Sequence, residues 1–439
     1  MSAKIKLGII EEYKELPKEE ILDKLADKII EIEKLKRKLK KYQNPHTPSS
    51  RQGFDKPQAQ GLKVGRKKGI KSGHKGKTRE WETPTNFIDV PAFCNPQTRN
   101  VNIKDTGNYV DRLIIDYKIQ KTVTSYRLHY YKDVDTNQIF LSAHPNVPER
   151  GIFGKNIIAL ANILHFQHRV TVAGIANIFT NVFDISMDQS TALDLGNRAA
   201  DSLKPHYESL GIEIQKSPVI NADETGSNQN GRSEWLWGFF TTTIAFFVFY
   251  GKRGGDILEK VLANFNGILG CDGWKTYKVF SEKYGLLLQR CWAHLIREVK
   301  YVCKDTELEK AYIWILDIYK KVKRARLLKR ESSRKKRYDE LVLELDQWTQ
   351  TYAHYRKMRK LVTLIRNGKE HWFTCVIHPE IEPTNNLAER KIRKFVILEK
   401  IMGCLRSEQG KITTQIMLSL VETWKSQGLN PYKQLRATL

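Results

Sequence analysis

The chain has 439 residues, enough for two to four domains, and its 41% hydrophobic and 10% aromatic residues are ample for packed cores. Its 74 Lys and Arg residues outnumber its 49 Asp and Glu residues by 25, which predicts a polyanionic partner, nucleic acid rather than an anionic membrane. There is no apolar run of roughly 18 residues, no signal-peptide segment and no CxxC pair among six scattered cysteines, so we expect a reduced, cytoplasmic chain.

The first predicted element is an amphipathic helix. Between Leu22 and Leu39, apolar residues recur at helical spacing and Lys and Glu fill the other positions. We assign residues 1–41 to this helix. It either pairs with a second copy as a short coiled coil or lies on the rest of the protein, because no strict seven-residue repeat is sustained.

A basic arm is predicted next, over residues 42–80. Residues 42–79 hold ten Lys or Arg and one acid, Asp55, with many Gly, Ser, Pro and Gln, so they cannot build a core. Such a segment typically follows a phosphate backbone or enters a minor groove, and a solubilising linker is the weaker interpretation. The side chains expected to contact DNA are Arg66, Lys67, Lys68, Lys71, Lys75 and Lys77.

Two small regions follow the arm. Residues 81–150 contain three β-type runs, RLIIDYKI, TVTSYRLHYY and NQIFLSA, which predict a small β unit. Residues 151–215 have the pattern of helices of ten to fifteen residues, with Ser186 and Ser190 as candidate caps. A helix-turn-helix is conceivable within 170–200, and we interpret the region as DNA-binding.

The remaining chain alternates between strands and helices. Residues 216–299 form a series of β-rich runs that ends in a helix. Residues 300–375 are helical in pattern and strongly basic, with eleven Lys or Arg and one Glu between 320 and 337. Residues 376–439 contain a helix beginning after Pro383 and a helical tail. The fold class is therefore multidomain α+β.

Three carboxylates are distinguished by their positions. Asp223 ends the apolar run 219–222, Asp272 follows the run 268–271 and precedes a glycine, and Glu389 lies in the first turns of a predicted helix. A sheet can bring such positions together, and clustered carboxylates are costly without a cation between them. Two Mg²⁺ or Mn²⁺ ions are the usual solution, and they support in-line phosphoryl displacement.

Each carboxylate also has a purely structural interpretation. Asp223 and Asp272 are compatible with strand-ending turns, and Glu389, three residues after Asn386, fits a capping box. Taken together, on a chain with a charge of +25, the three favour catalysis on polynucleotides.

These residues lie in motifs that resemble a known family. The motifs are ADETG (222–226), WLWGFF, CDGWKTY (271–277), CWAHLIRE (291–298), PTNNLAERKIR (383–393) and the tail LVETWKSQGLNPYKQL, preceded by NPHTPSSRQ and GRKKG…GHKGKTR. In their order and spacing, over nearly the whole chain, they resemble the insertion-sequence-66 transposases. That family is of the Asp-Asp-Glu class, with a ribonuclease-H-like core.

The resemblance implies both an active site and a reaction. Asp223, Asp272 and Glu389 would be the catalytic, metal-binding triad, and the 117 positions from Asp272 to Glu389 would contain a helical insertion. The reaction would be nicking at transposon ends, followed by attack of the freed 3′-hydroxyl on target DNA. The partners would be terminal inverted repeats and target DNA, with a homodimer in the synaptic complex, further transposon proteins, and a nucleoid location in a prokaryote.

Several residues of these motifs have candidate auxiliary roles. His294 either approaches the metal site or is a hydrogen-bonded structural residue, and the second is slightly favoured. Arg393, one helical turn after Glu389, either contacts the scissile strand or is an exposed charge. Asn385 and Asn386 are expected to cap the helix. Glu224 is expected to point away from the metal site, and core packing is expected for most of the residues Trp235, Trp237, Trp274 and Trp292.

The sequence departs from the family pattern at its zinc segment. The family commonly has two Cys pairs there, whereas Cys94 is followed at that spacing by Gln97, and no cysteine lies near His129. One thiol and one histidine do not complete a tetrahedral site, so we expect a degenerate zinc-ribbon-like unit without metal, and no zinc.

Two other functions remain open from the sequence alone. One is a related nuclease that cuts DNA without strand transfer, and the other is a domesticated, catalytically silent DNA-binding protein. The intact acidic triad argues against the second.

Overall fold

The structure is a computed structural model, and it describes residues 17, 20, 27–33, 35, 83–88, 90, 112, 114–148, 150–303 and 308–439. The chain divides into two compact units, residues 1–54 with 125–439, and residues 55–124. The described residues of the second unit contain no helix or strand. Within the described ranges, no helix is both long and apolar enough to cross a membrane.

The first unit contains both strands and helices, which confirms the α+β class. The strands are β1 (Tyr130–Lys132), β2 (Ile139–Leu141), β3 (Val219–Gln229), β4 (Arg232–Phe240), β5 (Ala245–Tyr250), β6 (Ile268–Cys271) and β7 (Leu287–Arg290). The first helices are α3 (Lys155–Asn162), the π-helix η3 (Ile163–Gln167), α4 (Val172–Val182), α5 (Gln189–Ile214), α6 (Asp256–Leu262), α7 (Lys275–Tyr284) and α8 (Trp292–Cys303). They are followed by α9 (Glu309–Arg326), α10 (Glu331–Tyr352), η4 (Arg356–Met358), α11 (Arg359–Arg366), η5 (Glu370–Trp372), α12 (Thr374–Ile377), α13 (Asn386–Met402), α14 (Glu408–Ser426) and α15 (Pro431–Thr438).

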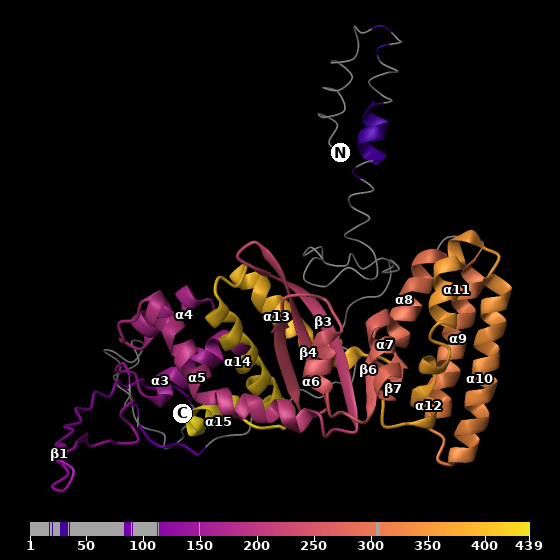
Figure 1. Ribbon diagram of the computed structural model, residues 1–439. Helices are drawn as coiled ribbons and strands as arrows, with labels where there is room; N and C mark the ends of the chain where they lie inside the picture. The colour runs from indigo at the N-terminus through magenta and orange to yellow at the C-terminus, as the bar shows by residue number, and fades with distance from the viewer. Residues whose placement is uncertain are drawn as a thin grey trace, which may run out of the picture. The chain divides into compact units, whose positions relative to one another are not determined.

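A five-stranded mixed sheet, in the order β5-β4-β3-β6-β7, is the centre of this unit (Figure 1). Strands β3, β4 and β5 are antiparallel, whereas β6 and β7 run parallel to β3. The two-residue turn Asn230–Gly231 joins β3 to β4, and both residues have positive φ angles, 47° and 85°. Such a turn matches the twist of a hairpin, so it sets the register that pairs Asp223 with Gly238.

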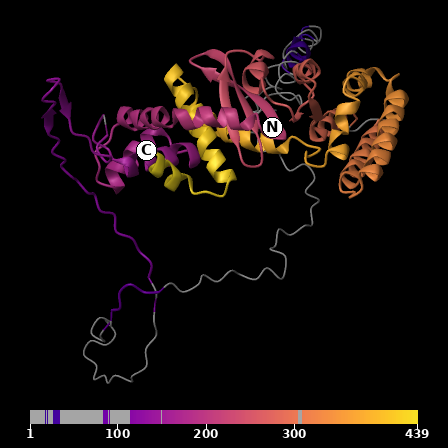
Figure 2. The ribbon, with the colours of Figure 1, turned by 60° about the horizontal axis from the view of Figure 1, so that its bottom comes forward.

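The helical region 151–215 shares one hydrophobic core with the sheet. Helix α5 buries one face, which includes Leu195, Leu203 and Leu210, and its Tyr207 hydroxyl donates to the Phe247 carbonyl of β5 at 2.8 Å. Helices α5 and α14 are in contact, and both lie next to the sheet (Figure 2). The predicted boundary at residue 215 therefore falls inside a continuous core.

Helix α14 covers the edge strand β5 with polar side chains. The side-chain oxygens of Gln415, Ser419 and Thr423 are spaced one helical turn apart. They accept hydrogen bonds from the backbone N–H groups of Phe249, Phe247 and Ala245 at 3.0, 2.9 and 3.0 Å. The edge N–H groups of these three residues are thus satisfied by a helix instead of a sixth strand.

A helical insertion separates β7 from α13, as the sequence predicts. Helices α8 to α12 form a second hydrophobic core, around the fully buried Trp292 and Trp348. The Trp348 Nε1 donates to the Ala311 carbonyl at 3.0 Å. In Figure 1 these helices group together at the β7 end of the sheet.

The N-terminal predictions have mixed outcomes. Residues 27–33 and 35 are helical and exposed, in agreement with the predicted helix. The basic arm, residues 42–80, lies outside the described residues. The β unit is smaller than predicted, because β1 and β2 form only a short antiparallel hairpin and residues 114–127 are exposed without forming a strand. Strands need partners and a buried face, and the hairpin continues only as far as His129, which exchanges hydrogen bonds with Ser142.

The caps of the 151–215 region were predicted wrongly. Helix α5 begins after Asp188, whose carboxylate accepts the Thr191 N–H at 2.6 Å and the Ser190 hydroxyl at 2.9 Å. Helix α4 is capped in the same way by Thr171. A carboxylate at the residue before the helix is a better acceptor than a serine inside the first turn, so Ser190 supports the cap instead of forming it.

Candidate active site

Asp223 lies in the middle of the central strand β3, not at its end as predicted from the apolar run before it. The strand continues to Gln229 because β4 pairs with it along the whole of this length. In the parallel pairing of β3 with β6, Asn221, two residues before Asp223, lies beside Gly270. Asp223 is therefore at the point where the parallel neighbour β6 ends and β3 continues alone beside β4.

Asp272 is the first residue after β6, as predicted. Its Oδ1 accepts the backbone N–H of Trp274 at 2.8 Å, which fixes the carboxylate at the start of the turn before α7. Because β6 is parallel to β3 and adjacent to it, the C-terminal end of β6 delivers Asp272 to the same region as Asp223.

Glu389 lies in the first turn of α13, and the start of this helix is tied to β3. The Asn385 side chain accepts from Asn221 Nδ2 at 2.9 Å and donates to the Ala222 carbonyl at 2.7 Å. It makes no capping hydrogen bond, so the predicted cap at Asn385 is wrong, since the side chain bridges to the sheet instead. The bridge ends one residue before Asp223, and it sets the position of Glu389 relative to that strand.

Charge interactions link the three carboxylates. Burial, followed by the negative charges of Glu224, Asp272 and Glu389, raises the pKa of Asp223 well above its usual range. Residues that are distant in the sequence therefore lie close enough to act electrostatically on one carboxyl group. A nearby cation would lower the cost of keeping these carboxylates charged.

A fourth acidic residue, Glu224, follows Asp223 in β3 and was not expected to take part. Arg253 donates to its carboxylate through Nε at 2.8 Å and also through Nη2, and the Tyr277 hydroxyl donates at 2.6 Å. Burial and the charge of Asp272 raise the pKa of Glu224 to about 7, against the opposing effects of Arg253 and Tyr277. The Arg253 guanidinium also stacks 4.4 Å from the Trp274 ring centroid.

Helix α8 of the insertion supplies two partners for Glu389. Arg297 donates through Nη2 to Glu389 Oε1 at 3.0 Å, and His294 Nδ1 lies 3.6 Å from the same oxygen. The sequence motif CWAHLIRE contains both residues, yet only His294 was singled out, and Arg297 was missed. The predicted auxiliary residues Arg393 and Asn386 are exposed on α13.

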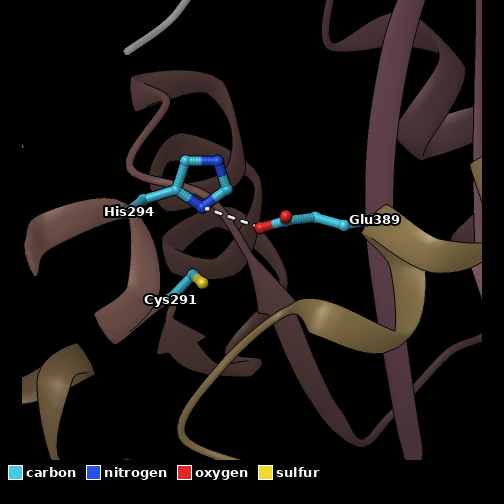
Figure 3. A group of neighbouring side chains, drawn as sticks. All are labelled: Cys291, His294 and Glu389. Atoms are coloured by element: carbon cyan, nitrogen blue, oxygen red, sulfur yellow. Dashed lines mark ion pairs between the residues drawn. The ribbon is translucent and has the colours of Figure 1, made fainter. Parts of the chain in front are cut away.

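Cys291, His294 and Glu389 form a tight group of potential metal ligands (Figure 3). Among the residues that the structure describes, this group has its sulfur, nitrogen and oxygen atoms all within 4.8 Å of one another. The thiol is buried, accepts the Asn385 N–H at 3.1 Å, and has its pKa raised to about 11 by burial. The Cys-x-x-His spacing is the sequence signal that could have revealed it.

The other predicted site residues are divided between the core and the arm. Trp237 and Trp292 are fully buried, which confirms core packing for them, and Trp235 and Trp274 are partly buried on either side of Arg253. The six basic residues assigned to DNA contact lie outside the described part of the chain.

Comparison with known proteins identifies the family. Residues 150–412 match the sequence profile described as "Transposase IS66 family", a region that includes the sheet, the insertion and all three carboxylates. The chain belongs to this family, which confirms the resemblance inferred from the motifs.

The similar curated proteins are from Sinorhizobium fredii (strain NBRC 101917 / NGR234). One, named "Uncharacterized protein y4jD", is 25% identical over 60% of this chain and 58% of its own length. Another, "Uncharacterized protein y4qI", is 26% identical over 52% of this chain and 48% of its own length. The chain thus spans about half the length of the curated relatives it matches.

Proposed function

We propose that this chain is a DNA transposase of the Asp-Asp-Glu class, with Asp223, Asp272 and Glu389 as its catalytic residues. The reaction is nicking of DNA at transposon ends, followed by transfer of the freed 3′-hydroxyl to target DNA. The observation that carries the proposal is the arrangement of three elements: β6 lies beside β3 and ends just before Asp272, and Asn385 ties the start of α13, which contains Glu389, to the residues of β3 that precede Asp223. The mixed sheet, antiparallel over β3 to β5 and parallel over β6 and β7, supports a ribonuclease-H-like core.

The donor set fits Mg²⁺ or Mn²⁺. Carboxylate oxygens are the ligands that these hard cations prefer. Burial and then the neighbouring negative charges raise the pKa of Asp223, and a divalent cation would favour its charged form. When bound, two such ions supply activation of a water or 3′-hydroxyl and stabilisation of the leaving oxygen. Asp223, Asp272 and Glu389 would hold them.

Other residues of the chain position these groups. Asn385 holds the start of α13 against β3 through two buried hydrogen bonds, so the first turn of the helix, which carries Glu389, is fixed relative to that strand. Arg297 donates to the Glu389 carboxylate, and the Trp274 N–H orients that of Asp272. Pre-organised side chains of this kind lower the cost of reaching the reactive geometry.

DNA binding is assigned to basic segments outside the acidic centre. The insertion carries eleven Lys or Arg between 320 and 337, on helices α9 and α10 and the loop between them, and the arm of residues 42–80 carries a further set. These charges would bind phosphates through release of counterions, so affinity would fall steeply with salt. A homodimer that joins two transposon ends follows from the proposed reaction.

The test is a set of isosteric variants in a nicking assay. Asp223→Asn, Asp272→Asn and Glu389→Gln should each reduce magnesium-dependent nicking of a terminal-repeat substrate by at least about a hundredfold, a typical loss for one transition-state group. Salt-dependent DNA binding and circular dichroism should stay close to those of the parent chain. Asp339→Asn, which removes an exposed carboxylate of α10, is the matched control and should nick normally.

The outcomes separate the alternatives. Wild-type nicking by all three variants would refute the triad. Nicking that depends on the triad, without joining to target DNA, would identify a nuclease instead of a transposase. Binding without any nicking would indicate a silent DNA-binding protein.

A further inference from the structure

Cys291 and His294 are not used by the proposed reaction, yet they lie against one of its residues. Cys291 is the residue between β7 and α8, His294 lies in the first turn of α8, and Glu389 comes from α13. The His294 Nδ1 and Glu389 Oε1 atoms are 3.6 Å apart, and the three ligand atoms all lie within 4.8 Å of one another. Figure 3 shows the imidazole and the thiol on one side, facing the carboxylate.

The donor chemistry of this group differs from that of the triad. Three carboxylates select hard cations, whereas a thiolate, an imidazole and a carboxylate are typical zinc ligands. With bonds of about 2.0–2.3 Å, tetrahedral zinc keeps its ligands roughly 3.3–3.8 Å apart. The His294–Glu389 separation of 3.6 Å already has this value, and the 4.8 Å limit leaves small side-chain movements to complete the set. The Arg297 guanidinium, which donates to the same Glu389 oxygen, would be displaced by the ion.

The surroundings also suit a bound metal. Cys291 is only 1% exposed, and its sulfur accepts the Asn385 N–H at 3.1 Å, a contact that favours the thiolate against the larger, opposing effect of burial. A bound cation would favour the thiolate further. The side chains of His294 and Glu389 are 17% and 31% exposed, so the group is open to solvent on the Glu389 side. An ion can therefore enter from that side and retain a water as its fourth ligand.

We propose that Cys291, His294 and Glu389 form a zinc site that overlaps the magnesium site. Because Glu389 is shared, zinc binding removes that carboxylate from the set that holds magnesium, and zinc is an inhibitor of nicking. The inhibitory part of this inference rests on the proposed function, whereas the zinc site itself does not. Such a site is occupied reversibly, and it differs from the structural zinc of the family's N-terminal segment.

The experiment uses the full chain and Co²⁺ as the spectroscopic probe. Co²⁺ bound at this site should give a thiolate-to-cobalt charge-transfer band, which added Zn²⁺ abolishes by displacement. Cys291→Ser keeps an acceptor for the Asn385 N–H but should lose the band. His294→Ala should weaken Co²⁺ binding by at least about tenfold, since even outer partners of metal ligands contribute that much.

Two controls separate this site from other ligands and from the triad. Cys404→Ser changes a partly buried thiol elsewhere and should keep the band. Asp272→Asn should also keep the band although it loses nicking. The charge-transfer band therefore tests the zinc site, and the nicking assay tests the triad independently. Circular dichroism establishes that each variant is folded.

The final measurement is inhibition, taken for each variant relative to its own rate without zinc. With magnesium kept below saturation, added Zn²⁺ should inhibit nicking by the parent chain and by Cys404→Ser. The zinc concentration needed to inhibit His294→Ala should be at least about tenfold higher. Absence of the charge-transfer band in the parent chain, or its persistence in Cys291→Ser, would overturn the zinc site. A normal band with no zinc inhibition would overturn the overlap with the catalytic centre.

Discussion

The two hydrophobic cores of the chain use buried polar groups in different ways. In the sheet core, buried side chains join elements far apart in sequence, as Asn385 does with Asn221 and Glu399 does with Ser227. In the insertion core, the described buried residues are almost all apolar, and ion pairs such as Arg337–Glu340 lie on exposed helix surfaces. The polar side chains of the sheet core thus bind one another, whereas buried tryptophans of the insertion core donate to backbone carbonyls, as Trp292 does to Trp372 at 2.6 Å and Trp348 does to Ala311 at 3.0 Å.

The largest expected effect is on the insertion core. Trp348→Ala removes a fully buried ring and its hydrogen bond to the Ala311 carbonyl, and should lower the free energy of unfolding by about 3–5 kcal/mol. Denaturant unfolding measures the loss. Trp314→Ala, at a partly buried position on α9, is the control and should lose less. Equal losses would show that the insertion is not built around Trp348.

The next largest effect is expected in the sheet core, where a substitution should lower activity as well as stability. Asn385→Ala removes two buried hydrogen bonds and leaves their partners unsatisfied, at a cost of about 2–3 kcal/mol, and nicking should fall because α13 loses its tie to β3. Asn430→Ala is the matched control. It removes a capping side chain of α15, costs about 1 kcal/mol and should leave nicking unchanged. Unchanged nicking in Asn385→Ala would show that the tie does not position Glu389.

A smaller effect, dependent on pH, is expected at the other end of α13. Glu399 accepts the Ser227 hydroxyl at 2.5 Å and the Asn228 N–H at 2.9 Å, but burial raises the pKa of Glu399. A raised pKa means that the fold favours the protonated acid, so this stabilising contribution is present below the unfolded value of about 4.3 and is lost as the pH rises through the folded value.

Glu399→Gln keeps the Oε1 acceptor and removes the charge. The variant should therefore gain stability relative to the parent chain at pH 7 and lose that advantage near pH 4. Urea unfolding at the two pH values measures this difference. A variant that is less stable than the parent at both pH values would show that the carboxylate itself is needed.

The smallest effect on stability is expected on the exposed surface of the insertion. Arg337→Gln breaks the surface ion pair with Glu340 and should change the free energy of unfolding by no more than about 0.5 kcal/mol. Its effect on DNA should be measurable, because each lost phosphate contact reduces the slope of binding against salt by about one. An unchanged slope would exclude this face of α10 from the DNA interface.

The sequence predicts those features that depend on local pattern. Asp272 after a short apolar strand, Glu389 in the first turn of a helix, and the helical insertion between them were all expected and are found. The length of β3 was not expected. The run from Glu224 to Gln229 is mostly polar, and it forms a strand because it pairs with β4. Pairing with a distant partner overrides local propensity.

Contacts between distant segments were the other source of error. The Arg297–Glu389 bond spans 92 positions, and the Asn221–Asn385 bond spans 164, so no spacing rule reveals them. Asn385 has the residue type and position of a helix cap, but its side chain donates to the Ala222 carbonyl of β3 instead of capping the helix. The Cys-x-x-His pair was visible, but its third member comes from another helix.

The row of side chains from α14 along β5 has a consequence for how two copies can meet. An uncovered edge strand invites another strand to add to the sheet, which is a common route both to dimers and to aggregation. The N–H groups of Ala245, Phe247 and Phe249 are already occupied, so a second chain finds no donors there. Two copies of the chain would therefore have to pair through surfaces other than the edge of β5.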